Sequence, residues 1–218
     1  MDNGRQIKDM LYEQVARIGK AISSPKRLEL IELLCQAEKA VETLAQEASI
    51  SMKLASAHLR ELRNARLVDT RREGKNIFYR LADKRVADFW VNVHSLAEDR
   101  LVELQEALHD LSLLPDELVP NDRESLMKAA RKGEVVVLDV RPVDEYLTAH
   151  LPFARSIPLG ELKHRLAELP KDRPIVAYCR GPYCLMARDA AALLRAGGYR
   201  AAHLKEGVAE WGLPAVYA

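Results

Sequence analysis

Residues 49–68 read SISMKLASAHLRELRNARLV, and this stretch decides the fold of the amino-terminal half. Ser51 is a favoured N-cap residue, so it predicts a helix that runs through about Arg66. The apolar side chains of this helix share one stripe, formed by Ala55, Leu59 and Leu62. A shorter helix over about 41–48 precedes it. Two helices joined by a tight turn predict a helix-turn-helix in which the second helix turns its polar face outward.

The pattern on either side completes a winged helix. After Leu67 the apolar residues alternate with a period of two around Gly74, which predicts a hairpin, a candidate wing. Upstream, apolar residues recur at intervals of three and four over 7–22 and 28–35, which predicts two more helices. Downstream, one long amphipathic helix is expected over 83–111. Its apolar stripe needs a partner, which a second subunit can supply.

Basic residues are concentrated around the helix-turn-helix, although the whole chain carries a formal net charge of only +1. Between Ser51 and Arg80 there are eight basic residues and three acidic ones. This local excess predicts contact with DNA phosphates and bases. The candidate DNA-binding residues are Lys53, Ser56, His58 and Arg60 on the helix and Arg71, Arg72 and Lys75 on the wing. A solvated charged face is the alternative, and His58 has either a packing role or a phosphate contact.

The run SSPKRLELIELL over 23–34, followed by residues 49–68 and the basic hairpin, resembles the ArsR family of small dimeric winged-helix repressors. The resemblance covers about residues 10–111. It implies a double-stranded DNA operator as partner and a homodimer formed through the terminal helices of the domain. Arg66 stands where the family commonly has glycine. Paired metal-binding thiols are missing, so Cys35 is expected to be a buried core residue and no metal site is predicted.

The carboxy-terminal half follows a different pattern. Residues 113–122, LLPDELVPND, are expected to form a linker. Beyond it, strand-like runs at 135–140 and 175–178 alternate with helical stretches, which predicts an α/β domain with a mostly parallel sheet. The predicted organisation is a winged-helix domain over 1–112, a linker over 113–122 and an α/β domain over 123–218.

Cys179 is the candidate nucleophile of this second domain. It follows the apolar run IVAY and precedes a loop and a helix, so backbone N–H groups and the helix dipole are expected to lower its pKa and to favour the thiolate. Gly181 and Pro182 shape the loop so that its amides converge on an anion. Arg180 adds a positive charge. The predicted active loop consists of Arg180, Gly181, Pro182, Tyr183 and Cys184.

The carboxy-terminal half resembles a rhodanese domain over about residues 120–218. The stretch 135–159, with Asp139, Arg141, Glu145 and His150, and the stretch 204–215 carry this resemblance together with the loop. It implies that Cys179 carries a sulfane sulfur taken from a small donor such as thiosulfate or a persulfide. Cys184 replaces the arginine that often ends the loop. It either resolves the oxidised sulfur through a disulfide or packs at the helix start. For Asp139 and Arg141 a structural role is favoured.

Three functions are open from the sequence. The favoured one is a DNA-binding transcriptional regulator that responds to or processes reactive sulfur. The alternatives are a sulfurtransferase that uses its winged helix for dimerisation or docking, and a regulator whose second domain only binds ligands. No cofactor is expected. Since no apolar run reaches the length of a membrane span and the amino terminus has no secretory signal, the expected location is the cytoplasm, with no membrane partner.

Overall fold

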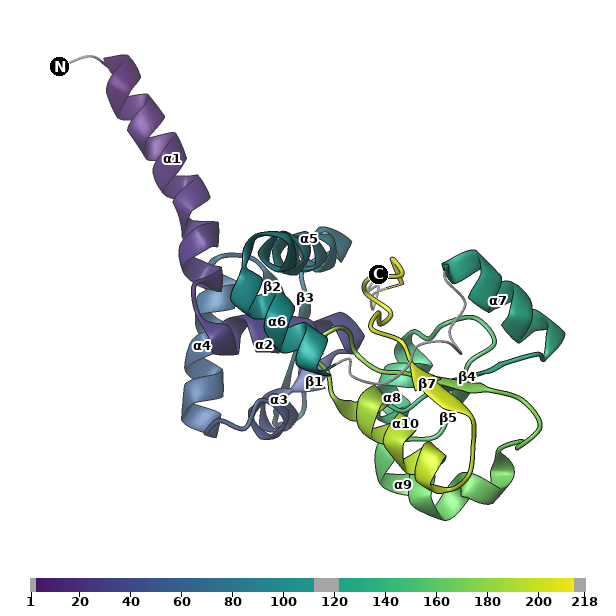
Figure 1. Ribbon diagram of the computed structural model, residues 1–218. Helices are drawn as coiled ribbons and strands as arrows, with labels where there is room; N and C mark the ends of the chain where they lie inside the picture. The colour runs from purple at the N-terminus through teal and green to yellow at the C-terminus, as the bar shows by residue number, and fades with distance from the viewer. Residues whose placement is uncertain (1–2, 112–121, 214–218) are drawn as a thin grey trace. The chain divides into compact units, whose positions relative to one another are not determined.

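The computed structural model describes residues 3–111 and 122–213 (Figure 1). Contacts divide the chain into two compact units that part between Trp90 and Val91. Most of the predicted linker lies outside the described residues, so the predicted domain boundaries stay a prediction. Asp122, assigned to the linker, instead caps the next helix, because its carboxylate accepts a hydrogen bond from Ser125 N at 2.8 Å. No helix within the described ranges is long and apolar enough to cross a membrane.

The first unit is a winged helix with its core between α2, α3, α4 and β3. Its elements are α1 (Asn3–Ile22), α2 (Pro25–Gln36), β1 (Lys39–Ala40), α3 (Val41–Glu47), α4 (Met52–Asn64), β2 (Val68–Glu73), β3 (Asn76–Leu81) and the first part of α5 (Lys84–Arg100). Leu30, Leu44, Leu59 and Leu62 are fully buried. Proline at the first position of α2 suits a helix start, because its fixed φ is already helical and its missing N–H has no partner there.

The predicted start of α4 is confirmed and its predicted end is wrong. Ser51 caps the helix, since its hydroxyl accepts a hydrogen bond from Leu54 N at 3.3 Å. The helix ends at Asn64 because Arg66 adopts a left-handed conformation with φ of +59°. The amides of Arg66 and Leu67 then bond back to the carbonyls of Arg63 and Leu62. This pair of bonds is a Schellman cap, which glycine usually provides.

The predicted hairpin is confirmed. β2 and β3 pair antiparallel with Glu73 opposite Asn76, which leaves Gly74 and Lys75 as a two-residue turn. Gly74 has a φ of +60°, and glycine adopts this value without the clash that a side chain would cause. The short strand β1, which the sequence did not predict, pairs with the other side of β3.

The single long helix expected over 83–111 is instead two helices, α5 and α6 (Val102–Leu111). The two helices meet at Leu101, whose N–H donates to the Ala97 carbonyl of α5 and whose carbonyl accepts from Leu104 N and Gln105 N of α6. The break leaves the carbonyl of Glu98 without its usual helical donor. The side-chain amide of Gln105 donates to it at 2.6 Å. The apolar periodicity continues across Leu101, so it gave no sign of this break.

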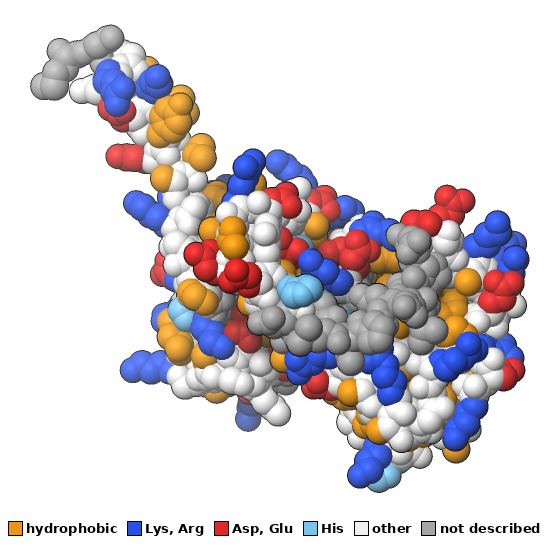
Figure 2. Space-filling view, viewed as in Figure 1, with side chains coloured by type: hydrophobic (Ala, Val, Ile, Leu, Met, Phe, Trp, Pro, Cys, Tyr) orange, Lys and Arg blue, Asp and Glu red, His pale blue; other side chains and the backbone are white. Residues whose placement is uncertain are grey.

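Helix α1 carries an uncovered apolar stripe within the first unit. Its exposed side chains are Ile7, Met10, Leu11 and Val15, and they follow the spacing of one helix face. Figure 2 shows these hydrophobic groups in orange along the helix. Large apolar side chains on one face of an exposed helix are typical of a surface that another protein covers.

The second unit is built on a parallel sheet, as predicted. After α6 its elements are α7 (Arg123–Lys132), β4 (Val136–Asp139), α8 (Val143–Thr148), β5 (Arg155–Ser156), α9 (Leu159–Arg165), a 3-10 helix (Leu166–Glu168), β6 (Ile175–Tyr178), α10 (Met186–Ala196) and β7 (Ala201–His203). The strand order is β5-β4-β6-β7, and every pair is parallel. Helices cover both faces, which explains why strand β6 is buried at every residue.

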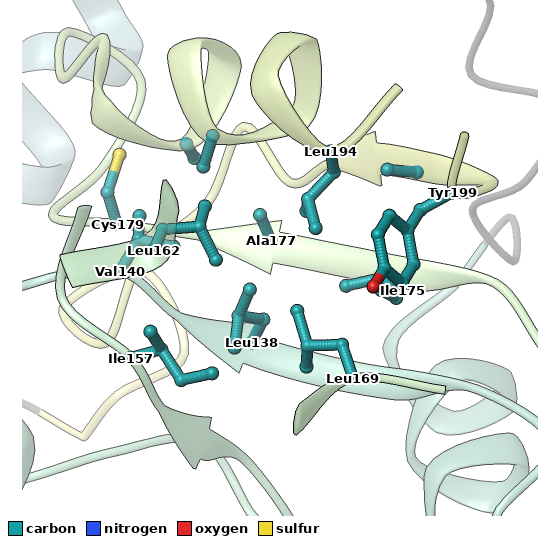
Figure 3. Close-up of a cluster of buried hydrophobic side chains, with 13 residues drawn as sticks. Leu138, Val140, Ile157, Leu162, Leu169, Ile175, Ala177, Cys179, Leu194 and Tyr199 are labelled. Carbon is teal, nitrogen blue, oxygen red and sulfur yellow. The ribbon is translucent and has the colours of Figure 1, made fainter. Parts of the chain in front are cut away.

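Alternate residues of the central strands face two separate cores. Leu138 and Ala177 join the core beneath α9 and α10, and Figure 3 shows this cluster with Cys179 at its edge. Val137 and Val176 face the other core, which packs against α7. The two central strands end side by side, so the residues that follow them, among them Cys179, meet at the carboxyl edge of the sheet. Ligands of open parallel sheets bind at this edge.

Candidate functional site

The polar face of α4 is exposed as predicted. Ala55, Leu59 and Leu62 are fully buried, whereas Lys53 and Arg60 are exposed on the outer face. The predicted contact residues Ser56 and His58 are only partly exposed. The outer face of the helix therefore carries two exposed cations and, beside them, two smaller polar groups that are partly covered.

His58 is partly exposed on α4, and its surroundings affect its charge. Burial, with the positive charge of Arg27 nearby, lowers the pKa of the His58 imidazole below its ordinary value. The ring is therefore neutral at neutral pH and adds no charge for a phosphate to attract. Both roles left open by the sequence, packing and a phosphate contact through a neutral ring N–H, stay open for His58.

The three predicted wing cations differ in their surroundings. Arg71 forms two 2.7 Å ion pairs, with Glu38 and with Glu73, and its guanidinium lies over the ring of Phe78. It would have to leave these partners to reach a phosphate. Arg72 and Lys75 are exposed. The side chain of Arg72 donates only a 3.2 Å hydrogen bond to the carbonyl of Gly74. These two residues are therefore the better candidates for phosphate contact.

Cys179 lies where the sequence placed it, directly after β6. The loop that follows leads into α10, and its turn is held by a 3.1 Å hydrogen bond from Cys184 N to Gly181 O. Gly181 has a φ of +155°, a value that other residues rarely adopt. Cys179 is 2% exposed and Cys184 is partly exposed. Both are free thiols.

The loop brings the two sulfur atoms together. The side chains of Cys179 and Cys184 hydrogen-bond to each other. The backbone N–H groups of Arg180 and Met186 donate to the sulfur of Cys184, and those of Gly181 and Ala187 donate to the sulfur of Cys179. The Cys179 thiol also lies 3.2 Å from the carbonyl oxygen of Cys184, to which it donates. The backbone N–H groups of this loop, which were expected to stabilise an anion on Cys179, thus donate to the sulfur of Cys184 as well.

The N–H groups of Gly181 and Ala187 act to lower the pKa of Cys179, as expected, but they are outweighed and the net lowering that was predicted is wrong. The hydrogen bond with Cys184, burial and the charge on Cys184 raise the pKa of Cys179 well above its ordinary value. The same hydrogen bond, with the N–H groups of Arg180 and Met186 and the charge of Arg180, lowers the pKa of Cys184 to about 6. The two thiols are too close for both to ionise, so the pair shares the first negative charge.

Arg180 is not the free cation that the sequence suggested. Its guanidinium binds the carboxylate of Glu145 with bonds of 2.6 and 3.0 Å to one oxygen. Glu145 lies on α8 and is fully buried, while the Arg180 side chain is 13% exposed. The charge of Arg180 is therefore largely neutralised. The pair ties the loop to α8 and fixes its path over the strand end.

A tight backbone contact holds the other side of the loop. A Cβ atom on Gly207 would lie 2.3 Å from the carbonyl oxygen of Arg180 and 2.7 Å from that of Cys179, so only glycine fits. The amide of Gly207 donates to the Glu210 carboxylate at 2.7 Å. A Cβ on Gly181 would lie 3.2 Å from the same carboxylate. Gly207 and Glu210 therefore fix the loop from the carboxy-terminal side.

Asp139 and Arg141 have the structural role that was favoured. Both are fully buried, and their side chains form a 2.6 Å ion pair. Arg141 also donates to the Ala149 carbonyl at 2.7 Å, and the hydroxyl of Tyr178 donates to Asp139 at 2.5 Å. This network joins the ends of β4 and β6 to the loop after α8. It shapes the edge of the sheet on which the active loop rests.

Cys35 is fully buried within α2, as expected for a core residue. Across residues 3–111 and 122–213, no group of three or more His, Cys, Asp or Glu side chains is placed to hold a metal ion.

Comparison with known proteins identifies both halves. Residues 24–70 match the family described as "Bacterial regulatory protein, arsR family", and residues 122–213 match the "Rhodanese-like domain". An HTH-type transcriptional regulator of Mycobacterium tuberculosis is 42% identical over 210 residues, which cover 95% of this chain and 92% of that protein. The chain belongs to the ArsR family. It is an ArsR-type regulator fused to a rhodanese-like domain.

Other similar proteins cover one half of this ArsR-family regulator each. A sulfurtransferase of Allochromatium vinosum is 35% identical over 100 residues, which cover 44% of this chain and 92% of that protein. A solved homodimeric winged helix-turn-helix domain from Mycobacterium bovis is 40% identical, covers 43% of this chain and 87% of its own, and superposes with a TM-score of 0.41.

Two positioning residues of the regulator were not identified from its sequence. The role of Glu145 as the buried partner of Arg180 was missed, because 35 residues separate the two. Glu210 was missed too, although it lies within the carboxy-terminal stretch that carried the rhodanese resemblance. A glycine three residues before a carboxylate was the only available signal, and this spacing is common.

Proposed function

We propose that this ArsR-family chain is a dimeric DNA-binding transcriptional regulator whose rhodanese-like domain accepts sulfane sulfur on the 179–184 loop. The observation that carries the proposal is the similarity to the mycobacterial transcriptional regulator, which extends over both halves of the chain. A two-domain arrangement kept within one regulator supports a regulatory role for the second domain as well.

The DNA-binding part of the proposal rests on α4 and the wing. Lys53 and Arg60 are exposed on the outer face of the helix, and Arg72 and Lys75 on the hairpin. Contacts to phosphates make affinity fall steeply with salt, whereas contacts to base edges make it depend on sequence. Fluorescence anisotropy with DNA from the protein's own promoter, at several salt concentrations and against a scrambled duplex, tests this. Binding that is weak and equal for both duplexes would contradict it.

The dimer rests on the uncovered apolar stripe of α1. Leu11 is 58% exposed at the middle of that stripe. Placing a charge there should weaken an interface, because the carboxylate would have to be buried without a partner. Sedimentation of the wild-type protein and of Leu11→Glu, with Glu13→Gln as the control on the same helix, measures the effect. A monomeric wild-type protein would refute the dimer.

The sulfur-accepting part rests on a thiol pair held by backbone N–H groups at the edge of a parallel sheet. Thiolates attack sulfane sulfur, and N–H groups stabilise the anion that results. The reduced chain is treated with a small persulfide, and its intact mass and the sulfide released are measured. A double variant, Cys179→Ser with Cys184→Ser, should show neither product. Equal reaction of wild type and double variant would refute the proposal.

Regulation requires that sulfur on the loop changes operator affinity. Such coupling typically amounts to about 1 to 3 kcal/mol, or roughly 5- to 150-fold in affinity. Anisotropy at fixed salt compares reduced protein, persulfide-treated protein and the treated double variant. We expect only the treated wild-type protein to change. Equal affinity of all three would mean that the two domains act independently.

Sulfur transfer as the main activity is the second candidate. The similarity to the Allochromatium vinosum sulfurtransferase, which spans 92% of that protein, favours it. Transfer of sulfur from thiosulfate to cyanide, measured as thiocyanate, separates this candidate from a purely regulatory role. Many turnovers per chain together with no specific operator binding would support the enzyme over the regulator.

A further inference from the structure

Arg71 lies on strand β2 of the wing, and its side chain reaches across the neighbouring strand. β3 is the central strand of the three-stranded sheet, with β2 on one side and β1 on the other. The Cζ atom of Arg71 lies 5.0 Å from the centre of the Phe78 ring on β3, and its Nε donates to the carboxylate of Glu38 at 2.7 Å. Glu38 directly precedes β1. The side chain of Arg71 therefore joins β2 to the start of β1.

The strand β1 is also fixed to the helix-turn-helix. Lys39, the residue after Glu38, is buried and forms a 3.2 Å ion pair with Glu47 on α3. β1 then runs directly into α3 at Val41. Consecutive residues of a strand point to opposite faces, so Glu38 and Lys39 hold different neighbours. Through these two ion pairs the wing is connected to the first helix of the helix-turn-helix.

The outer part of the wing has no third strand beside it within the described residues. β1 has only two residues, which pair with Phe78 and Tyr79 of β3. Beyond Phe78 the hairpin is a two-stranded ribbon, and such ribbons are marginally stable by themselves. The exposed cations Arg72 and Lys75 belong to this ribbon. Arg71 lies opposite Phe78, at the end of the three-stranded part, where a side-chain bridge to β1 can fix the direction of the ribbon.

The charges around Arg71 disfavour a phosphate contact. Glu73, two residues further along β2, forms a second 2.7 Å ion pair with Arg71. One positive and two negative side chains give the cluster a net charge of −1, which repels a phosphate. An arginine that left this cluster would leave two carboxylates without their cation. A network of several charges with an aromatic face also holds its members more firmly than a single exposed pair does.

We propose that Arg71 is a positioning residue that makes no phosphate contact. Its bond to Glu38 fixes the wing relative to the helix-turn-helix, so that Arg72 and Lys75 reach the DNA backbone. This inference rests on the proposed DNA binding, and it gives Arg71 a different role from the direct DNA contact that the sequence suggested. It also makes a carboxylate, that of Glu38, a group that favours DNA binding.

Positioning and simple electrostatics predict opposite effects at Glu38. Removing a carboxylate from a DNA-binding domain ordinarily raises affinity, because the phosphates are repelled less. If Glu38 positions the wing, Glu38→Gln weakens binding instead, because the ribbon must then be ordered when DNA binds. Glu73→Gln is the matched control, since it removes the same charge and one bond to Arg71 but leaves the bridge to β1 in place.

Operator affinity of the full chain is measured by fluorescence anisotropy with a duplex from the protein's own promoter. We expect Glu38→Gln and Arg71→Ala each to weaken binding by about two- to fivefold, the range of one exposed ion pair. The double variant should bind no more weakly than Arg71→Ala, because both changes break the same bond. Glu73→Gln should bind at least as tightly as the wild-type protein.

The salt dependence of binding shows whether Arg71 itself contacts a phosphate. Each phosphate contact contributes about 0.9 to the slope of log affinity against log salt concentration. Arg72→Ala should therefore lose slope relative to the wild-type protein. Arg71→Ala and Glu38→Gln should have equal slopes, because neither change removes a phosphate contact of its own.

Hydrogen exchange of the free protein tests the bridge without DNA. The backbone amides of residues 72–77 should exchange faster in Glu38→Gln and Arg71→Ala than in the wild-type protein and Glu73→Gln, because the ribbon opens more often. Circular dichroism and melting curves show whether each variant is folded at the temperature of the assays.

Three results would overturn the inference while the proposed function stands. Tighter binding by Glu38→Gln, as by Glu73→Gln, would show that Glu38 only repels the DNA. A slope lower by about 0.9 in Arg71→Ala than in Glu38→Gln would show that Arg71 binds a phosphate. Equal exchange of residues 72–77 in all the proteins would show that the bridge does not hold the wing. If the wild-type protein binds no duplex specifically, the proposed function fails, and this inference fails with it.

Discussion

Replacement of Arg66 by glycine should stabilise the protein, although it removes a long side chain. Arg66 follows α4 with a φ of +59° and is exposed. The left-handed conformation costs a residue with a side chain about 1 to 2 kcal/mol. Glycine avoids this cost, but it gains roughly 0.4 to 1 kcal/mol of additional conformational freedom in the unfolded chain. The free energy of unfolding should therefore rise by about 0.5 to 1 kcal/mol in Arg66→Gly.

Urea and thermal unfolding followed by circular dichroism measure this difference. For a domain of this size a gain of that order raises the melting temperature by roughly 2 to 8 °C. Arg66→Ala is the matched control, because it loses the same charge and side chain but keeps a Cβ in the strained conformation. Ser49, with a φ of +52° after α3, offers a second test in Ser49→Gly. If Arg66→Gly is no more stable than Arg66→Ala, the left-handed strain does not explain the helix end.

Three other predictions follow from the contacts of the site. Glu145→Gln should lower the free energy of unfolding by about 3 kcal/mol in urea titration, since it breaks a buried ion pair. By contrast, Glu161→Gln at an exposed pair should cost less than about 1 kcal/mol, and equal losses would contradict the role of burial. In salt titrations, Arg72→Ala should weaken binding to all duplexes and flatten the salt slope, whereas Lys53→Ala should change sequence preference; identical effects would remove this division between wing and helix. The rate at which iodoacetamide alkylates Cys184 should be full above pH 7 and fall as the pH drops through about 6, because the thiolate is lost there; a midpoint near the ordinary thiol pKa would contradict the lowered value.

The sequence alone was sufficient for the features that depend on neighbouring residues. The inward stripe of α4, the Ser51 cap, the hairpin around Gly74 and the buried strand before Cys179 were all predicted and are present. Periodicity and caps act over a few residues, so local sequence carries them. The parallel sheet was also predictable, because strands that alternate with helices leave little choice of topology.

Only the tertiary structure decided the chemistry of the loop. Arg180 is neutralised by Glu145, which comes from a helix far earlier in the chain, and Gly207 closes on the loop from its other end. The sequence places Cys179 and Cys184 in one loop, but it does not show that their side chains hydrogen-bond to each other or that Cys179 is the more deeply buried. The pKa of a thiol is set by burial, by hydrogen-bond donors and by nearby charge, all of which depend on how distant segments pack. The sequence therefore determined where the thiols lie, and the packing around them decided how readily they ionise.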